Sequence, residues 1–275
     1  MNFIDFILNL AGLLLWINWR STLSDPFEKR TPATLVGALR RAAPTRFRRW
    51  HLLAALGGLL VLRALLYWQV GPATGWSGRL DLGVTIIFFR SNFFGHMFLF
   101  SVFSFARLLG IIYLWLLLMS ILEGPMPIHR LVKMQLGKID VWPRWIKFVL
   151  PLVITPLFWG LASWPFAWLH PRPSMSVAHH AEEALVIGLG SYLVWKFLIG
   201  ALLVLHLLGS YIYFGNHPFW KYVDATAQTL LNPLKKIPLQ AGNADFAPVV
   251  GIALVFLSAE LAGRALAWLY ARLPL

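Results

Sequence analysis

Residues 229–250, TLLNPLKKIPLQAGNADFAPVV, form a polar interruption between two long apolar stretches of the sequence. Pro233 and Pro238 flank an adjacent pair of lysines, and a Gly-Asn-x-Asp turn follows them. Pro248 stands at the start of the next apolar stretch, where proline is tolerated because the first turn of a helix does not use its N–H. Adjacent lysines beside an apolar stretch are typical of a cytoplasmic connection at the membrane surface. The pattern predicts two transmembrane helices joined by a basic connection.

The composition of the whole chain is that of a multi-pass membrane protein. Hydrophobic residues make up 59% of the 275 residues and charged residues only 13%, against about 25% charged in a soluble domain. Several apolar runs exceed the roughly 20 residues that cross a bilayer core. The chain has no cysteine, which excludes disulfides, thiolate metal sites and cysteine nucleophiles.

Lysine and arginine are concentrated in alternate connections. Residues 20–50, residues 123–144 and the connection that contains the quoted stretch hold eight, four and three of them. The connections between these hold one or two each, so the positive-inside rule places the three basic ones in the cytoplasm and both termini outside. This predicts an all-α membrane protein with six transmembrane helices. The connections also explain the net charge of +13; no nucleic-acid-binding motif accompanies that charge, and no nucleic-acid partner is expected.

Two segments between the predicted spans are harder to interpret. Residues 83–94 are apolar but interrupted by Arg90-Ser91-Asn92, and they are either re-entrant or interfacial. The connector at residues 170–183 ends in a His-His-x-Glu-Glu group. Neighbouring histidines on a connector are more often solvated than metal-bound, so no metal site is predicted there.

The features of the quoted stretch recur in the other basic connections. Residues 34–41 read TLVGALRR and residues 229–236 read TLLNPLKK, while Val132 aligns with Val223. Chance similarity between apolar sequences is the alternative to an internal repeat. We predict three related helical hairpins, each made of a span, a basic amphipathic cytoplasmic connection and a return span. The hairpins comprise residues 1–82, 83–169 and 170–275.

The quoted stretch resembles the YggT family of small integral membrane proteins. That family has a span, an amphipathic segment ending in Pro-x-Arg-Arg-x-x-Pro, a Gly-rich turn, and Asp-x-Ser-Pro at the start of a second span. The residues that match are Pro233, Lys235, Lys236, Pro238, Gly242, Asp245 and Pro248. Lysines replace the arginines, and Ala247 replaces the usual serine. The similarity is strongest over residues 200–257, weaker over residues 110–158 and faint before that.

The resemblance implies a bacterial inner-membrane protein with an organising or assembly role and no enzymatic activity of its own. In the family, such roles concern osmotic tolerance, cell division and nucleoid placement, and cytochrome maturation in photosynthetic relatives. The matched prolines and Gly242 would then fix the path of the connection as structural-motif residues. The extra first hairpin is a departure from the simple two-repeat form of the family.

Charged residues inside the predicted spans are the most informative feature, because each costs several kcal/mol unless it is paired, solvated or able to reach the headgroups. Six fall in the outer half of the bilayer under the predicted topology: Asp5, Arg63, Arg107, Lys196, Glu260 and Arg264. They converge on an outward-open polar cavity, receive an acidic residue from a partner, or extend singly to the outer headgroups. Glu260 and Arg264 have the i,i+4 order that favours an ion pair.

We therefore expect an organising or assembly factor, or a subunit of a membrane-protein complex. Its expected partners are membrane lipids and either another membrane protein or a second copy. The expected contact residues are Arg40, Arg41, Lys235, Lys236 and Asp245. A small transporter or channel with a polar, outward-facing cavity is the alternative. No catalytic set, nucleotide-binding loop or cofactor site is apparent in the sequence.

Overall fold

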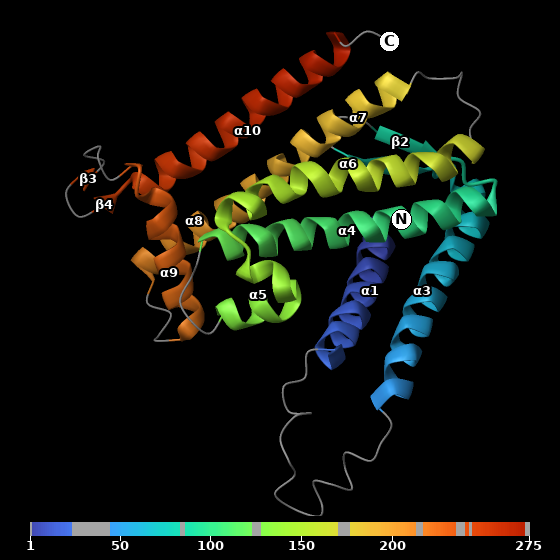
Figure 1. The fold of residues 1–275 in the computed structure, drawn as a ribbon, viewed down its shortest axis with the longest axis horizontal. Coiled ribbons are helices and arrows are strands. Elements are labelled where there is room, and N and C mark those ends of the chain that lie inside the picture. Colours follow the sequence, from blue (N-terminus) through green and yellow to red (C-terminus); the bar gives the residue numbers. More distant parts are fainter. Residues whose placement is uncertain are drawn as a thin grey trace, which may run out of the picture. The chain divides into compact units, whose positions relative to one another are not determined.

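The computed structural model describes residues 2–23, 45–82, 86–122, 128–169, 177–212, 217–234, 240–241 and 244–272. Helices make up nearly all of this structure (Figure 1). Six helical segments are long and apolar enough to cross a membrane: Phe3–Ser21, Trp50–Thr74, Phe94–Leu122, Arg144–Ala162, His180–Tyr211 and Ala247–Arg272. The prediction of an all-α membrane protein with six candidate spans is confirmed.

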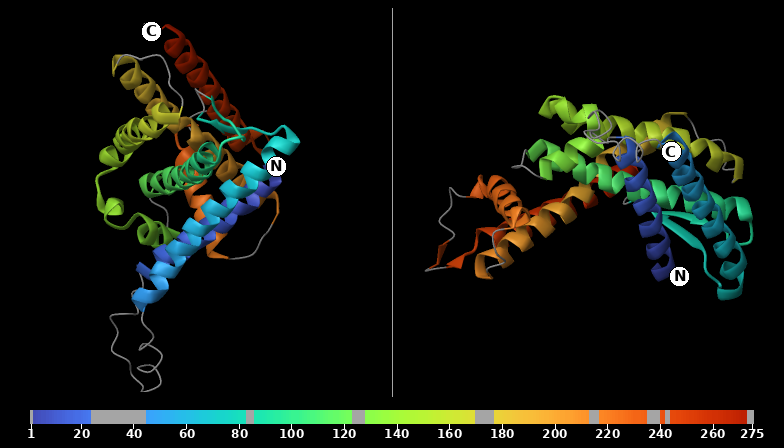
Figure 2. Two further views of the ribbon diagram at one scale, coloured as in Figure 1. Left: turned by 90° about the vertical axis from the view of Figure 1, so that its right-hand side faces the viewer. Right: turned by 90° about the horizontal axis from the view of Figure 1, so that it is seen from below.

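The chain divides into two compact units, and the first comprises residues 1–80 and 87–110. It contains α1 (Asn2–Leu23), α3 (Thr45–Thr74) and the first part of α4 (Phe94–Leu122). The helices α1 and α3 pack against each other (Figure 2). Gly12 permits the close approach of α1 to α4, since a Cβ at this position would lie 2.9 Å from the Phe105 ring.

A pair of short strands lies between α3 and α4, and the second strand falls within residues 83–94, for which the re-entrant and interfacial alternatives remain predictions. Strand β1 (Gly78–Asp81) pairs with β2 (Ile86–Phe89), and α4 begins at Phe94. Burial alternates along both strands, with Leu80, Ile87 and Phe89 inside, as the period of a strand requires. Gly78 is needed for this packing, because a Cβ there would lie 2.9 Å from the ring of Phe100.

The second unit comprises residues 81–86 and 111–275. After the end of α4 it contains α5 (Ile128–Leu136), η2 (Gly137–Val141), α6 (Arg144–Leu169), α7 (Val177–Gly190), η3 (Ser191–Val194), α8 (Trp195–Tyr211), α9 (Pro218–Leu231), β3 (Gln240–Ala241), β4 (Ala244–Asp245) and α10 (Ala247–Arg272). In this unit α6 packs against α7, while α8 packs against both α9 and α10. The three predicted hairpins remain a prediction, since these contacts do not test the repeat.

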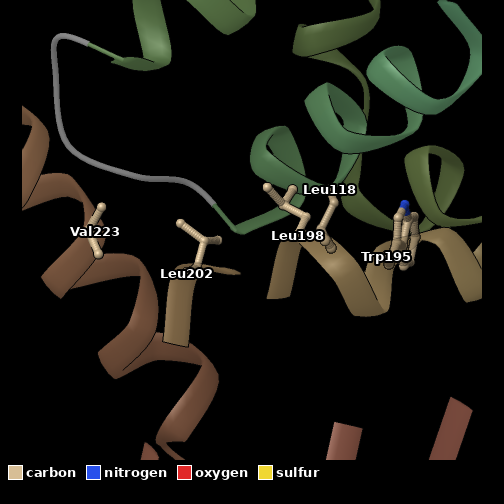
Figure 3. Packing of buried hydrophobic residues seen from close by; sticks show 5 residues of the cluster. All are labelled: Leu118, Trp195, Leu198, Leu202 and Val223. Carbon is tan, nitrogen blue, oxygen red and sulfur yellow. The ribbon is translucent and has the colours of Figure 1, made fainter. Parts of the chain in front are cut away.

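The core of the second unit is built on α8. Trp195, Leu198 and Leu202 lie along one side of this helix and pack with Leu118 of α4 and Val223 of α9 (Figure 3). The Trp195 indole Nε1 donates a hydrogen bond to the carbonyl of Leu114 at 3.0 Å, which satisfies its one polar atom. The apolar face of α8 thus joins two helices that are distant in the sequence.

The fifth predicted span, which the sequence places within residues 184–214, starts earlier and is less regular in the structure. Helix α7 begins at Val177, so the part of the predicted connector from residue 177 to residue 183 is helical, and its histidines lie on a helix instead of a loop. Its polar residues concealed the start of this helix from a hydropathy argument. A 3₁₀ segment then separates α7 from α8, and the Ser191 hydroxyl donates to the Gly188 carbonyl at 2.7 Å beside this change of helix type.

The connection before the final span is an amphipathic helix, α9. His217 is its N-cap and accepts a hydrogen bond from the Phe219 N–H at 3.3 Å, and Pro218 occupies the first turn. The buried face carries Val223, Ala227 and Leu231 and packs on α8. An exposed polar face and a buried apolar face are what a surface helix of a folded protein requires.

Three features of the connections bear on the sequence analysis. Pro248 is the second residue of α10, so its predicted place at a helix start is confirmed. In the middle connection α5 ends at Leu136, and the next residue, Gly137, has a φ of +60°, which glycine readily adopts. Val132 and Val223, which the proposed repeat aligns, are both buried; the repeat itself remains a prediction.

We predict that Leu202→Ala lowers the free energy of unfolding by about 2–5 kcal/mol, because the shortened side chain leaves a cavity in the core. Leu202 is 4% exposed. Leu208 is on the same helix and 43% exposed, so the matched change Leu208→Ala should cost less than about 1 kcal/mol. Thermal unfolding in detergent measures both. Equal losses would contradict the assignment of this core.

Candidate functional site

The Arg63 guanidinium is buried in the first unit, where α1, α3 and α4 meet. Its side chain is 1% exposed, although it belongs to a candidate span. NH2 donates to the Asp5 carboxylate and, at 2.8 Å, to Ser104 Oγ. NH1 donates to Asn9 Oδ1 at 2.7 Å, and Nε donates to Tyr67 Oη at 3.2 Å. These bonds use four of the five N–H groups of the guanidinium.

The Asp5 carboxylate is held from the other side by two further donors. Tyr67 Oη donates to Oδ1 at 2.6 Å, and Asn9 Nδ2 donates to Oδ2 at 3.2 Å. We call Asp5, Asn9, Arg63, Tyr67 and Ser104 the Arg63 cluster. Helix α1 supplies its acid and amide, α3 its base and phenol, and α4 its second hydroxyl.

Aromatic rings pack around the Arg63 cluster. The guanidinium carbon of Arg63 lies 5.5 Å from the ring centroid of Tyr67 and 5.7 Å from that of Phe100. Trp76 and Phe89 extend this group, with ring centroids 5.5 Å from that of Phe100 in both cases. The attraction between a cation and an aromatic ring is stronger where bulk water is excluded than at a solvated surface.

The Arg63 cluster therefore fixes the register of three helices. Every hydrogen bond in it joins side chains at a set distance, so a shift of one helix along another breaks several bonds together. Burial of the guanidinium beside the half-buried Asp5 carboxylate is costly, and the pair is favourable only because the remaining donors and acceptors are also satisfied. The sequence singled out Asp5 and Arg63 separately, and the structure brings them together.

A second ion pair lies on α10, in the second unit. Arg264 Nε donates to Glu260 Oε1 at 2.9 Å, which confirms the predicted i,i+4 pair. In contrast to the Arg63 cluster, this pair is on the surface of its own unit: the side chains are 57% exposed for Glu260 and 75% for Arg264. An ion pair on the outside of a candidate span is the least expected feature of the described structure.

The other two predicted intramembrane charges are not members of these pairs. Arg107 is exposed on α4, and Lys196 is half-buried on α8, with its Nζ 5.2 Å from the Phe197 ring centroid. Among the described residues, neither cation takes part in an ion pair. Convergence of the six charges on one outward-open cavity remains a prediction.

The predicted contact and motif residues are only partly described. Pro233 is exposed directly after the end of α9, Asp245 belongs to β4, and Pro248 is buried in α10. Gln240 pairs with Asp245 and Ala241 with Ala244, so two antiparallel strands flank the predicted Gly-Asn turn. The others lie outside the described residues: Arg40, Arg41, Lys235, Lys236, Pro238 and Gly242.

Sequence reasoning missed a second buried charge cluster, in the second unit. Lys147 Nζ lies 4.0 Å from Asp140 Oδ1, and both side chains are at most 5% exposed. Ser120 Oγ donates to Asp140 Oδ1 at 2.6 Å, and Lys147 Nζ donates to the Ser120 carbonyl at 3.4 Å. That carbonyl belongs to the last turn of α4, where a cation is favourable. A lysine as the second residue of a predicted apolar span, residues 146–169, was the signal available in the sequence.

A further polar contact, also missed, joins α8 to α9. His206 Nδ1 lies 2.7 Å from Asp224 Oδ1, with the histidine side chain mostly buried and the aspartate exposed. On the buried side of α9, burial raises the pKa of the Tyr222 hydroxyl above its usual value of 10. These contacts hold the amphipathic helix on the end of α8.

We predict that Arg63→Met lowers the free energy of unfolding by about 3–5 kcal/mol, because it leaves the Asp5 carboxylate without its cation. Arg107→Met is the matched control in the same unit, and it should change the unfolding temperature little because Arg107 is exposed. Thermal unfolding in detergent compares the two. The double change Asp5→Asn with Arg63→Met should recover part of the loss. Equal effects of Arg63→Met and Arg107→Met would contradict the structural role of the cluster.

Comparison with known proteins found no family model, no curated protein and no solved structure that matches this chain. The resemblance to the YggT family therefore remains a prediction from the sequence.

Proposed function

We propose that the chain is a non-enzymatic membrane protein that organises or assembles a membrane-protein complex, and that α10 is where it contacts its partner. The observation that carries this proposal is the exposed ion pair of Glu260 and Arg264 on a candidate span. Polar groups inside membrane proteins are normally turned toward other helices, since lipid offers them no hydrogen bonds.

The depth of the pair makes its exposure costly. Glu260 is the fourteenth of the 26 residues of α10, and Arg264 follows one helical turn later. A charged side chain near the middle of a bilayer costs about 2.5–3.5 kcal/mol or more. Pairing reduces this cost, but the exposed edges of both groups still lack further hydrogen-bond partners in hydrocarbon. A neighbouring protein segment can supply them.

The geometry of the pair also argues against extension of Arg264 to the headgroups. Its guanidinium is bonded to Glu260, one turn nearer the middle of the helix, and this bond draws it away from the C-terminal end of the span. Its exposed neighbours are apolar: Leu257 is 58% exposed, Leu261 58% and Trp268 57%. A charged pair in an apolar surface is a typical mark of a specific helix contact in membranes.

The finer parts of the proposal come from the sequence. The Lys and Arg distribution over six candidate spans supports cytoplasmic basic connections with both termini outside. The placement in a bacterial inner membrane rests on the resemblance to the YggT family. The YggT-like motif supports an assembly role. Under this proposal the basic pairs Arg40–Arg41 and Lys235–Lys236 contact anionic headgroups or an acidic partner at the cytoplasmic surface.

The alternative, a transporter or channel, needs charged groups that are open to a solute. Arg63 does not fit that role well, because four of its N–H groups are already bonded within the Arg63 cluster and its side chain is 1% exposed. The described geometry therefore favours assembly over transport. Solute flux through liposomes that contain the purified chain is the direct measurement of the alternative.

The assembly proposal is tested by native mass spectrometry after gentle solubilisation from membranes at native expression. We expect a stoichiometric protein partner with the wild-type chain. In the double variant Glu260→Leu with Arg264→Leu, the amount of bound partner should fall by about tenfold or more, because interhelical polar contacts in membranes are worth roughly 1–2 kcal/mol. The matched control changes two exposed leucines of α6, Leu157→Phe with Leu161→Phe, and should keep the partner. A wild-type chain that carries only lipid would contradict the proposal.

A further inference from the structure

The strands β1 and β2 pack against the two candidate spans that they lie between. A Cβ on Gly78 of β1 would lie 2.9 Å from the Phe100 ring of α4, and the ring centroid of Phe89 in β2 lies 5.5 Å from that of Phe100. Trp76, just before β1, has its ring centroid 4.8 Å from that of Tyr67 on α3. These contacts hold the strand pair at a fixed place along both helices.

The helix positions of these contacts give the depth of the strand pair in the membrane. Phe100 is six residues after Phe94, where α4 begins, and Tyr67 is seven residues before Thr74, where α3 ends. At about 1.5 Å of rise per residue, both contacts lie roughly 10 Å from a helix end. The 29 residues of α4 extend about 43 Å, the thickness of a bilayer with its headgroups. The strand pair therefore lies near the boundary between headgroups and hydrocarbon.

Backbone hydrogen bonding favours this boundary over a deeper, re-entrant position. A sheet of two strands leaves the outer edge of each strand without a strand partner. Open sheet edges do not occur in lipid-exposed hydrocarbon, because nothing there bonds to their N–H and C=O groups. Water and headgroups do bond to them, so the strand pair is stable only at the level of the headgroups.

The outer face of the strand pair carries a cation beside an aromatic ring. Arg79 and Phe88 are exposed positions of the two strands, and the Arg79 guanidinium carbon lies 5.3 Å from the Phe88 ring centroid. Arg90 directly follows β2 and is also exposed. Among the described residues, neither arginine takes part in an ion pair. The ring contact limits the freedom of the Arg79 guanidinium and keeps it at the outer face.

We propose that this strand pair is a phospholipid-binding surface, in which Arg79 and Arg90 bind the headgroup phosphate and Phe88 lies against the glycerol backbone and the first acyl carbons. The guanidinium is a planar fork of donors that matches two phosphate oxygens. The inference is independent of the proposed contact on α10, because all three residues belong to the first unit.

Charge and depth together favour lipid over a protein segment as the occupant. The described strands hold one acid, Asp81, against the two arginines, so the surface has a positive charge to offer. Every phospholipid beside the strand pair supplies a phosphate at this depth, with apolar carbons directly below it. Aromatic side chains at the headgroup level are typical of such contacts. A protein segment would have to bring its own acid to the same level.

A nitroxide spin label tests the position of the strand pair, and the natural lack of cysteine leaves no other site to label. The chain with Phe88→Cys is placed in vesicles of phosphatidylglycerol and phosphatidylcholine. Leu62→Cys is the hydrocarbon reference, since Leu62 is 51% exposed in the middle of the span Trp50–Thr74. We expect position 88 to collide with both dissolved oxygen and a water-soluble nickel chelate, and position 62 with oxygen alone.

Three results of this labelling would overturn the inference. Low collision with both reagents at position 88 would show that protein covers the strands. High collision with nickel but not oxygen would place them in water, and the same pattern as position 62 would make them re-entrant.

Phosphate binding is measured beside the strands, with a bimane fluorophore on Asn92→Cys, an exposed residue just before α4. A phospholipid with a nitroxide on its headgroup quenches this fluorophore when it is titrated into the purified chain in detergent. Arg79→Gln should raise the half-quenching concentration about tenfold, because a hydrogen bond to a charged group is lost. Arg79→Lys, which keeps the charge without the planar fork, should raise it less.

Arg107→Gln is the matched control for this titration. It removes an exposed arginine of the same unit that lies about 20 Å from the start of α4, so the quenching should not change. Unlabelled phosphatidylglycerol should compete with the nitroxide lipid, whereas diacylglycerol, which lacks the phosphate, should not. Equal quenching curves for Arg79→Gln and Arg107→Gln, or equal competition by the two lipids, would overturn the phosphate site.

Discussion

An ionised side chain in the hydrocarbon of a bilayer has no water to hydrogen-bond, and this constraint explains much of the described structure. The clearest response to it is the contact between Asp5 and Arg63. The two charges meet where three helices approach one another, and every bond that completes their hydrogen bonding comes from another described side chain. Helix register in the first unit follows from this requirement, because no other alignment satisfies the same donors and acceptors.

The chain meets the same constraint differently in its second unit. Lys147 is placed at the C-terminal end of α4, where the helix carbonyls and Asp140 share the charge. Glu260 and Arg264 bond to each other on an otherwise apolar face. Buried clusters complete themselves within the chain, whereas an exposed pair is complete only when something polar covers it. Because of that difference, the proposed partner contact is on α10 and not at the more extensive Arg63 cluster.

How well each of these features can be predicted from the sequence depends on how far apart along the chain its residues lie. Apolar length and proline position are local, so the six spans and the start of α10 at Pro248 follow from the sequence, as does the i,i+4 pair. The strands β1 and β2 were missed because four residues of alternation beside Phe93 and Phe94 resemble part of an apolar run. The partnership of Asp5 with Arg63 joins residues 58 positions apart, and periodicity carries no information about such pairing. Lys147 looked like an ordinary flanking cation, because its burial depends on where α4 ends.

The central claim is that protein, and not lipid, covers the face of α10 that carries Glu260 and Arg264. A nitroxide spin label at Leu261→Cys, next to Glu260 on that helix, tests it most directly in native membranes, with Leu161→Cys on α6 as the reference. The proposed function predicts an immobilised spectrum and low collision with dissolved oxygen at position 261, against a mobile spectrum and high oxygen collision at position 161. Equal mobility and equal oxygen collision at the two positions would show that this face of α10 faces hydrocarbon and would contradict the proposed function.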